Sequence, residues 1–512
     1  MVARAARQPQ ALPGRAGMQR RIFARRFLFA RTGKNRRSQK ASAQRPGCTL
    51  ERADLLLQHG VLRCAPRQCA GRANAFANQL PDGRLLSRAR EKRPRSEIGS
   101  GAAVTVEARQ PCRLLVKYCR RHACHYRISP MQLNASELRE RIAPLFEENF
   151  QKFGELGAAV SVWQHGKSMV DLCGGFRDAG RVVPWSDDTL VLIWSATKGL
   201  GSACVLHVLQ ERKIDIEQRV AEFWPEFAQA GKEKITLAQL LSHQAGLCAL
   251  DRQVDVLDHA AVIAALEKQA PLWPPGTGHG YHARTFGFLI DELVRRVARQ
   301  SLGEYWRTTF AEPLHLDLWV GLPERENHRV ATIYAAKAGK PPEPASFYRD
   351  LTKPGTLVRK TFTSPRGLHA VSSMNNPQIR AQPIVSFGGI GSASSLARFY
   401  SMLANGGALD GREFFSAKTM SWMTTTLTDG TDRVFQIPTA FSAGFMKDSK
   451  RSKRRIFGRS TIAFGHPGAG GSHAFGDPGN KVAFAYVMNQ MEQSVLPNEK
   501  SLRLVDAIYD LL

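Results

Sequence analysis

The charge of this chain changes abruptly near residue 130, and this step limits where a folded domain can lie. Residues 1–130 contain 29 lysines and arginines but only 6 acidic residues, whereas residues 131–512 contain 43 and 38. Almost all of the formal net charge of +28 therefore belongs to the first segment. Arginines interrupt nearly every apolar stretch there, and such a composition buries too little apolar surface to offset the entropy of ordering. The sequence predicts that the folded body comprises residues 131–512.

Three interpretations of the basic leader, residues 1–130, remain open. An arginine-rich segment with few acidic residues is typical of an organelle transit sequence, and it also suits a basic tail that binds nucleic acid or acidic membranes. The third interpretation is that the leader is translated upstream sequence and that Met131 is the initiator. We favour the third, because Met131 is followed at once by an amphipathic helix pattern with Asn134 or Ser136 as its cap. Nucleic acid or a membrane is thus expected as a partner only if the leader is native.

The cysteines are also divided unevenly between the two segments. Six of the nine lie in the leader, and the other three are scattered over residues 173–248. Free, widely spaced thiols favour a reducing compartment, so a cytoplasmic location is expected, or an organelle if the leader is native. His279 and His282 match neither of the common histidine metal motifs, and neither a metal nor a cofactor is expected.

Strand patterns occupy both ends of the body. Residues 158–163 and 168–172 flank a hairpin signal, and strand-like runs recur between about residues 440 and 488, before an amphipathic helix that starts near residue 499. Helical patterns dominate between them, which indicates an α/β (α+β) fold with the site in the seam between a sheet part and an all-helical part. The sheet part is expected at about residues 131–190 and 430–512, the helical part at about 191–430, and a variable insert that shapes the substrate pocket at 336–384.

The clearest candidate for chemistry is a serine and a lysine three residues apart, Ser195 and Lys198, where an apolar run becomes a helix. Positions i and i+3 share a helix face with Cβ atoms roughly 5 to 6 Å apart, so the lysine head can lie against the hydroxyl. A serine hydroxyl is a weak nucleophile at neutral pH and needs such a neighbour to activate it. The spacing also occurs by chance in an exposed helix, so it must be weighed with the rest of the chain.

Two further segments carry polar side chains on loops. A Pro/Gly-rich turn at residues 273–283 delivers Tyr281 just before an amphipathic helix pattern. Near the C-terminus, His466 and Gly468 lie between two apolar, strand-like runs. Three other candidates are weaker. Ser472 lacks the strand-serine-helix context of a nucleophile elbow, the adjacent pair at residues 242–243 is expected to be structural, and the basic run at 450–455 is expected to form a solvated hairpin tip.

In this order, the serine-lysine, tyrosine and histidine-glycine segments resemble the active-site elements of the serine β-lactamase and penicillin-binding-protein superfamily. Their form is most similar to class C β-lactamases and family VIII carboxylesterases. Residues 240–247 and 391–407 resemble two further conserved stretches of that superfamily, so the likeness extends from about residue 135 to the end. It implies a β-lactamase/transpeptidase-like fold, with an antiparallel sheet flanked by helices and an all-helical domain.

The resemblance also implies a mechanism, which is acyl transfer through a covalent acyl-enzyme. Ser195 would attack the substrate carbonyl, and Tyr281, held as a phenolate or near it by Lys198, would accept the proton. The backbone N–H groups of Ser195 and Ala469 would hold the oxyanion. His466 and Gly468 would form the substrate wall, with the histidine orienting the substrate or the tyrosine.

Two departures from the superfamily bear on the substrate. The lactamases carry an asparagine where this chain has Ala283, and a lysine where it has His466. Histidine has an ordinary pKa of about 6.5, so it offers no permanent cation at pH 7 to grip a substrate carboxylate. We therefore expect a carboxylesterase that acts on short-chain esters. A D-aminopeptidase or a weak β-lactamase is a nearby alternative, and a basic nucleic-acid or membrane-surface binder with an inactive hydrolase body is an alternative of another class.

Overall fold

The computed structural model describes residues 132–337, 339 and 344–512. The expectations for the leader at residues 1–130, and for Met131 as the initiator, lie outside the described residues. None of the helices in the described part of the chain is both long enough and apolar enough to cross a membrane.

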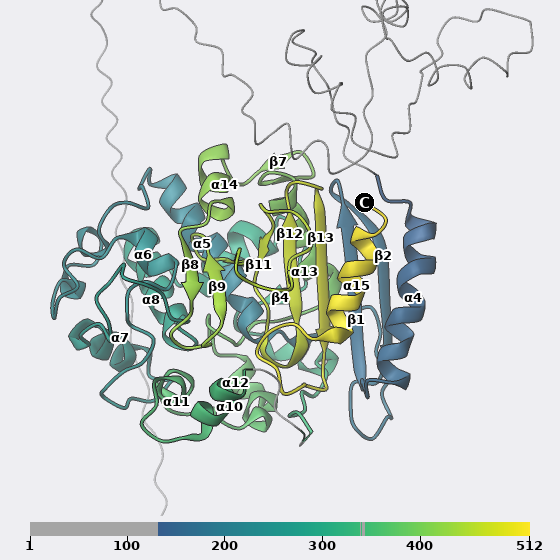
Figure 1. Cartoon of the computed structure of the whole chain (residues 1–512), viewed down its shortest axis with the longest axis horizontal. Coiled ribbons are helices and arrows are strands. Elements are labelled where there is room, and N and C mark those ends of the chain that lie inside the picture. Colours follow the sequence, from purple (N-terminus) through teal and green to yellow (C-terminus); the bar gives the residue numbers. More distant parts are fainter. Residues whose placement is uncertain (1–131, 338, 340–343) are drawn as a thin grey trace, which may run out of the picture. The chain divides into compact units, whose positions relative to one another are not determined.

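An eight-stranded sheet, antiparallel at each paired neighbour, forms the centre of the folded body (Figure 1), in the order β2-β1-β13-β12-β11-β10-β9-β8. The first two strands and the last ones are neighbours, since β1 pairs with β13 along its length. The strands are β1 (Gly157–Gln164), β2 (Lys167–Gly175), β8 (Thr428–Thr431), β9 (Pro438–Phe441), β10 (Met446–Lys447), β11 (Phe464–Gly465), β12 (His473–Asp477) and β13 (Val482–Met488).

The hairpin expected near the start of the body is β1 and β2, joined by His165 and Gly166. Both joining residues have positive φ angles, 51° and 78°, as a tight two-residue hairpin turn requires. The C-terminal strands begin earlier than expected, at Thr428 rather than near residue 440. The reason is that β8 is a short edge strand of polar residues and glycine, so it carries no apolar alternation that a sequence pattern could reveal.

Helices cover both faces of this sheet. Alternate residues of β13 belong to different cores: Phe484 and Tyr486 pack with α4 (Ala135–Gln151) and α15 (Glu499–Tyr509), whereas Ala485 packs toward α13 (Ala393–Ala404). This two-residue alternation is the normal consequence of strand geometry. Figure 1 shows α4 and α15 side by side against the sheet. Asn134 caps α4, as expected, by accepting hydrogen bonds from the Ser136 and Glu137 N–H groups.

The middle of the chain is mainly helical, and α5 is its central element. Nearly every residue of α5 is buried, because α8 and α9 pack around it. This part is not helical throughout: a small antiparallel sheet in the order β3-β5-β4 lies within it, and α13 packs on the large sheet although it falls before residue 430. The elements are α5 (Thr197–Glu211), α6 (Leu237–Leu241), α7 (His259–Lys268), α8 (Thr285–Ala298), α9 (Leu302–Trp306), α14 (Ala417–Thr424), β3 (Val191–Leu192), β4 (Leu318–Trp319) and β5 (Ile390–Gly391). A short two-stranded sheet also joins β6 (Ala408–Leu409) and β7 (Arg412–Glu413).

The described residues of the expected insert, 336–384, form mainly short helices. Its described residues form α10 (Ala345–Thr352), α11 (Leu357–Thr363) and α12 (Pro377–Arg380). Phe347 of α10 packs on Phe435, which in turn stacks on Tyr281, so the insert supports the tyrosine loop from outside.

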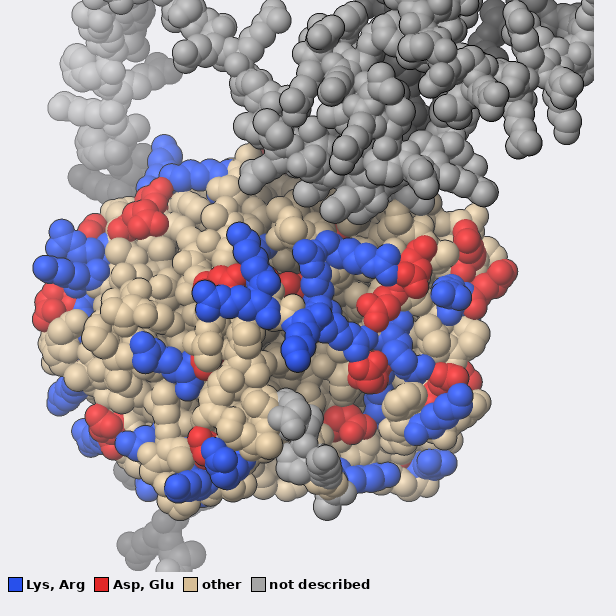
Figure 2. All heavy atoms as spheres, viewed as in Figure 1, with Lys and Arg blue, Asp and Glu red and all other residues tan. Residues whose placement is uncertain are grey.

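The basic run at residues 450–455 lies in the loop between β10 and β11. Figure 2 shows basic side chains gathered near the centre of one face, among acidic ones. Arg454 forms ion pairs with Glu499 and Asp506 of α15. Exposed pairs of this kind contribute about 0 to 1 kcal/mol each, so the loop is a solvated surface that docks on α15.

Candidate active site

Ser195 lies in a sharp turn between β3 and α5. Residues Trp194–Ala196 form one turn of 3-10 helix, and Trp194 adopts a left-handed φ of 49°, which is costly for a large side chain. Thr197 holds the turn in place, because its hydroxyl donates to the Trp194 carbonyl at 2.5 Å and accepts from the Gly389 N–H at 2.8 Å. The turn thus presents Ser195 two residues before the first residue of the helix that carries Lys198.

Lys198 is fully buried and its amine is held by two backbone carbonyls. Its Nζ donates to the Ala283 oxygen at 2.8 Å and to the Ser386 oxygen at 2.7 Å, and lies 3.4 Å from the Ser195 Oγ. Burial holds the pKa of Lys198 well below its usual value, and the nearby Arg284 lowers it further. A neutral amine has two N–H groups and one lone pair. The amine donates to both carbonyls and, at 3.4 Å, to the Ser195 Oγ, so the loss of one proton would turn its lone pair toward that hydroxyl.

Tyr281 faces the same two groups from the loop before α8. The Lys198 Nζ lies 4.9 Å from the centre of its ring, and the ring stacks on Phe435 with centroids 4.7 Å apart. Burial raises the pKa of the phenol well above its usual range, and the nearby Ser195 hydroxyl lowers it as a smaller effect, although no hydrogen bond joins the two hydroxyls. Burial disfavours both an anionic tyrosine and a charged lysine, so these surroundings argue against the expected phenolate, which stays untested.

Buried histidines surround the tyrosine, and burial lowers their pKa values. His466 lies beside Tyr281 with ring centroids 5.8 Å apart, its Nδ1 is 2.8 Å from the Pro467 oxygen, and burial lowers its pKa to about 3. His282 is likewise buried with a pKa of about 3, and its Nε2 accepts the Leu247 N–H at 2.9 Å. The wall formed by His466 therefore carries no positive charge at neutral pH. The Nε2 of His466 has no hydrogen-bond partner within the described part of the chain.

Gly468 brings the C-terminal loop against the Ser195 turn. A Cβ atom at this position would lie 2.3 Å from the Ile193 carbonyl oxygen, so only glycine allows so close an approach. The Gly468 N–H donates to the Ser472 oxygen at 2.7 Å and is already used. The assignment of the Ser195 and Ala469 N–H groups as oxyanion donors stays a prediction.

Two residues that position the site carry no signal in the sequence. Asp432 is fully buried and accepts hydrogen bonds from the backbone N–H groups of Tyr281, Val434 and Phe435, at 3.2, 2.7 and 2.9 Å. Ser386 holds Lys198 through its carbonyl oxygen. Neither belongs to a recognisable motif, and each acts on a segment about a hundred or more residues away, so no local pattern could have revealed them.

Within residues 132–337, 339 and 344–512, no group of three or more His, Cys, Asp or Glu side chains is placed to hold a metal ion. The pair at residues 242–243 is not a catalytic dyad. The Ser242 hydroxyl donates to the Ala238 carbonyl at 2.6 Å, whereas the Nδ1 of His243 accepts the His282 N–H at 3.2 Å. The two side chains therefore serve different structural contacts.

The fold and the serine-lysine-tyrosine arrangement together define a class of protein, the serine hydrolases of the β-lactamase and penicillin-binding-protein type. A family model described as Beta-lactamase matches residues 146–507. The chain belongs to this family, and it is a serine hydrolase.

Three relatives illustrate the range of this family. The esterase/β-lactamase LipL of Mycobacterium tuberculosis is 34% identical over 354 residues, which cover 67% of this chain and 78% of that protein. A crystal structure of a family VIII carboxylesterase is 34% identical with a TM-score of 0.66. A penicillin-binding protein homologue from Caulobacter crescentus is 36% identical with a TM-score of 0.65. Both structures cover 75% of this chain, and this chain covers 99% of each.

Proposed function

We propose that this protein hydrolyses short-chain, uncharged carboxylic esters through an acyl-enzyme on Ser195. The observation that carries the proposal is the setting of Lys198, a buried amine that donates to two carbonyls, lies 3.4 Å from the Ser195 Oγ and has its pKa lowered by burial. Such an amine can accept the serine proton without a phenolate as intermediary.

In the first half of the reaction, the Ser195 Oγ bonds to the ester carbonyl carbon as its proton moves to the Lys198 Nζ. The carbonyl oxygen becomes an oxyanion that the N–H groups of Ser195 and Ala469 hold. When the carbon-oxygen bond to the alcohol breaks, the neutral Tyr281 hydroxyl gives its proton to the leaving alkoxide and takes one back from Lys198. In the second half, water attacks the acyl-enzyme and loses its proton to the same amine; as the bond between the carbonyl carbon and the Ser195 Oγ breaks, the amine returns that proton to the Oγ and the carboxylic acid leaves.

The proposed preference for uncharged esters follows from the absence of a positive charge on His466, which lines the proposed substrate wall. His466 is neutral at any pH well above about 3, so it offers no cation to a substrate carboxylate. The names of the relatives, an esterase/β-lactamase and a family VIII carboxylesterase, agree with ester hydrolysis. The first of these names also keeps weak β-lactamase activity as a second candidate.

The proposal is tested by labelling the full chain with a fluorophosphonate probe. Ser195→Ala should abolish labelling, whereas Ser472→Ala, in the nearby glycine-rich loop, should leave Ser195 labelled. Labelling that survives in Ser195→Ala would overturn the nucleophile assignment. Turnover of p-nitrophenyl butyrate should exceed that of a chromogenic cephalosporin, and the reverse ranking would overturn the substrate class.

A further inference from the structure

The first turn of α8 is completed by a side chain from a distant segment. Arg284 occupies the N-cap position of α8, but its side chain makes no capping hydrogen bond. Instead the Ser386 Oγ accepts the N–H of Gly287, the third residue of the helix, at 2.7 Å. The same hydroxyl donates to the Arg284 carbonyl at 2.6 Å. Ser386, about a hundred residues away in the same chain, thus makes the capping hydrogen bond that a serine at the N-cap position normally makes to its own helix.

The peptide of Ser386 also touches the proposed base. Its carbonyl accepts one Lys198 N–H, and the Ala283 carbonyl, one residue before the capped Arg284, accepts the other. The Ser386 hydroxyl therefore ties together the two backbone segments whose oxygens hold Lys198. Gly287 fits this contact closely, because a Cβ there would lie 2.4 Å from the Ser386 nitrogen and 2.6 Å from its Oγ.

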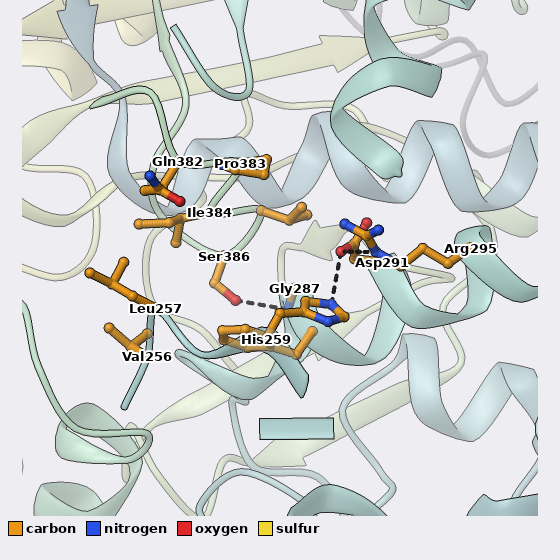
Figure 3. A pocket seen from close by; sticks show the side chains of 12 residues that line it. Val256, Leu257, His259, Gly287, Asp291, Arg295, Gln382, Pro383, Ile384 and Ser386 are labelled. Atoms are coloured by element: carbon orange, nitrogen blue, oxygen red, sulfur yellow. Dashed lines mark hydrogen bonds and ion pairs between the residues drawn. The ribbon is translucent and has the colours of Figure 1, made fainter. Parts of the chain in front are cut away.

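A cavity of about 120 Å³ lies on the other side of this contact (Figure 3), and Gly287 and Ser386 belong to its lining. Figure 3 shows the Ser386 hydroxyl directed at Gly287, with His259 and Asp291 across the cavity. The cavity reaches the surface, since the lining residue Leu257 is 44% exposed. Ser386 is therefore part of the wall between a surface-connected cavity and the buried amine of Lys198.

We propose that Ser386 is a positioning residue: its hydroxyl fixes the two carbonyls that hold Lys198 and closes the wall that keeps water from that amine. The inference rests on the proposed role of Lys198 as the proton acceptor. Without the hydroxyl, the Arg284 carbonyl and the Gly287 N–H lose a buried partner, and water from the cavity takes its place. Hydration of the amine then weakens the main cause of its low pKa, which is burial.

The sign of the pH effect follows from the groups that face Lys198. Lys198 acts as a base only when neutral, so the rate rises with pH through its pKa, and a higher pKa moves this rise to higher pH. If a carbonyl oxygen also moved away from its Lys198 N–H, that loss would lower the pKa of the amine, because the carbonyls stabilise its charged form. Hydration, which raises this pKa, is the stronger effect because burial is the first cause of the shift. The titratable and charged groups that surround Lys198 are Tyr281, His243, His282, His466 and Arg284.

The test compares the pH dependence of fluorophosphonate labelling in the full chain and its variants. Ser386→Ala should label Ser195 about tenfold more slowly at pH 7, as expected for a displaced base, with the rise in rate shifted upward by about one pH unit. The matched control is Ser416→Ala, which removes another serine cap, that of α14. This control should lower the melting temperature and leave the pH dependence unchanged.

The outcomes separate this inference from the proposed function. Absence of Ser195 labelling in the wild type would refute the proposed function, whereas a labelled Ser386→Ala with the wild-type pH dependence would refute only the role of Ser386. If Ser386→Ala does not fold, Gly287→Ala decides, because its Cβ displaces the Ser386 backbone and should produce the same upward shift. Wild-type pH dependence in Gly287→Ala would overturn the inference. Ser386→Thr, which keeps the hydroxyl, should retain the wild-type profile.

Discussion

Replacing Lys198 with methionine tests which group accepts the Ser195 proton. The two side chains have similar length, so the variant removes the amine and fills most of its space. General-base catalysis contributes typically 10²- to 10⁴-fold, and kcat/KM should fall by that factor, or about 2.7 to 5.5 kcal/mol in activation free energy. The rise of kcat/KM with pH that reflects deprotonation of the Lys198 amine should disappear as well.

The same variant has two opposing effects on stability. The carbonyls of Ala283 and Ser386 lose their donor, which costs about 1 to 3 kcal/mol each when buried. Against this, Lys198 has a depressed pKa in the folded state, so the wild type loses stability as pH falls from the unfolded value of about 10.5 through the folded pKa. Methionine has no such loss. We therefore expect urea denaturation to show a smaller deficit at pH 6 than at pH 10.

The assay is kcat/KM for p-nitrophenyl butyrate between pH 5 and 10, measured for the wild type, Lys198→Met and Tyr281→Phe. The phenylalanine variant should be slower, because it cannot protonate the leaving alcohol, but it should keep the acid-side rise of the wild type. If Tyr281→Phe loses that rise while Lys198→Met keeps it, the tyrosine is the base and the reasoning from the buried amine is refuted.

Three further predictions concern the wall, the loop anchor and the first helix. His466→Lys should raise the ratio of cephalosporin to ester turnover about tenfold, through one added charge contact; an unchanged ratio would contradict the argument from charge. Asp432→Ala should lower the free energy of unfolding by about 2 to 5 kcal/mol, since it leaves several buried donors unpaired, and Asp432→Asn should cost less; equal losses in urea titrations would count against this anchor. Asn134→Ala should cost about 1 kcal/mol by the same measurement and leave kcat/KM unchanged.

Much of the fold could be read from the sequence because its signals are local. The Asn134 cap, the β1–β2 hairpin and the apolar stripe of α8 each depend on residues that are close together in the sequence. The strands missed by pattern are those without such a signal, since β8 is polar and β3, β4 and β5 are two residues each. Short strands of this kind are defined by the partners they meet rather than by their own composition.

The sequence by itself determined the spacing of Ser195 and Lys198, the loop that delivers Tyr281, and the histidine that replaces a lysine at position 466. Only the tertiary structure decided in which direction the pKa values of Lys198 and Tyr281 shift, because these shifts depend on burial, and the carbonyls that hold Lys198 lie 85 and 188 residues from it along the chain. For the same reason it alone revealed Asp432 and Ser386, whose hydrogen bonds join segments that no local pattern connects. A charge depends on its complete surroundings, and folding is what assembles them.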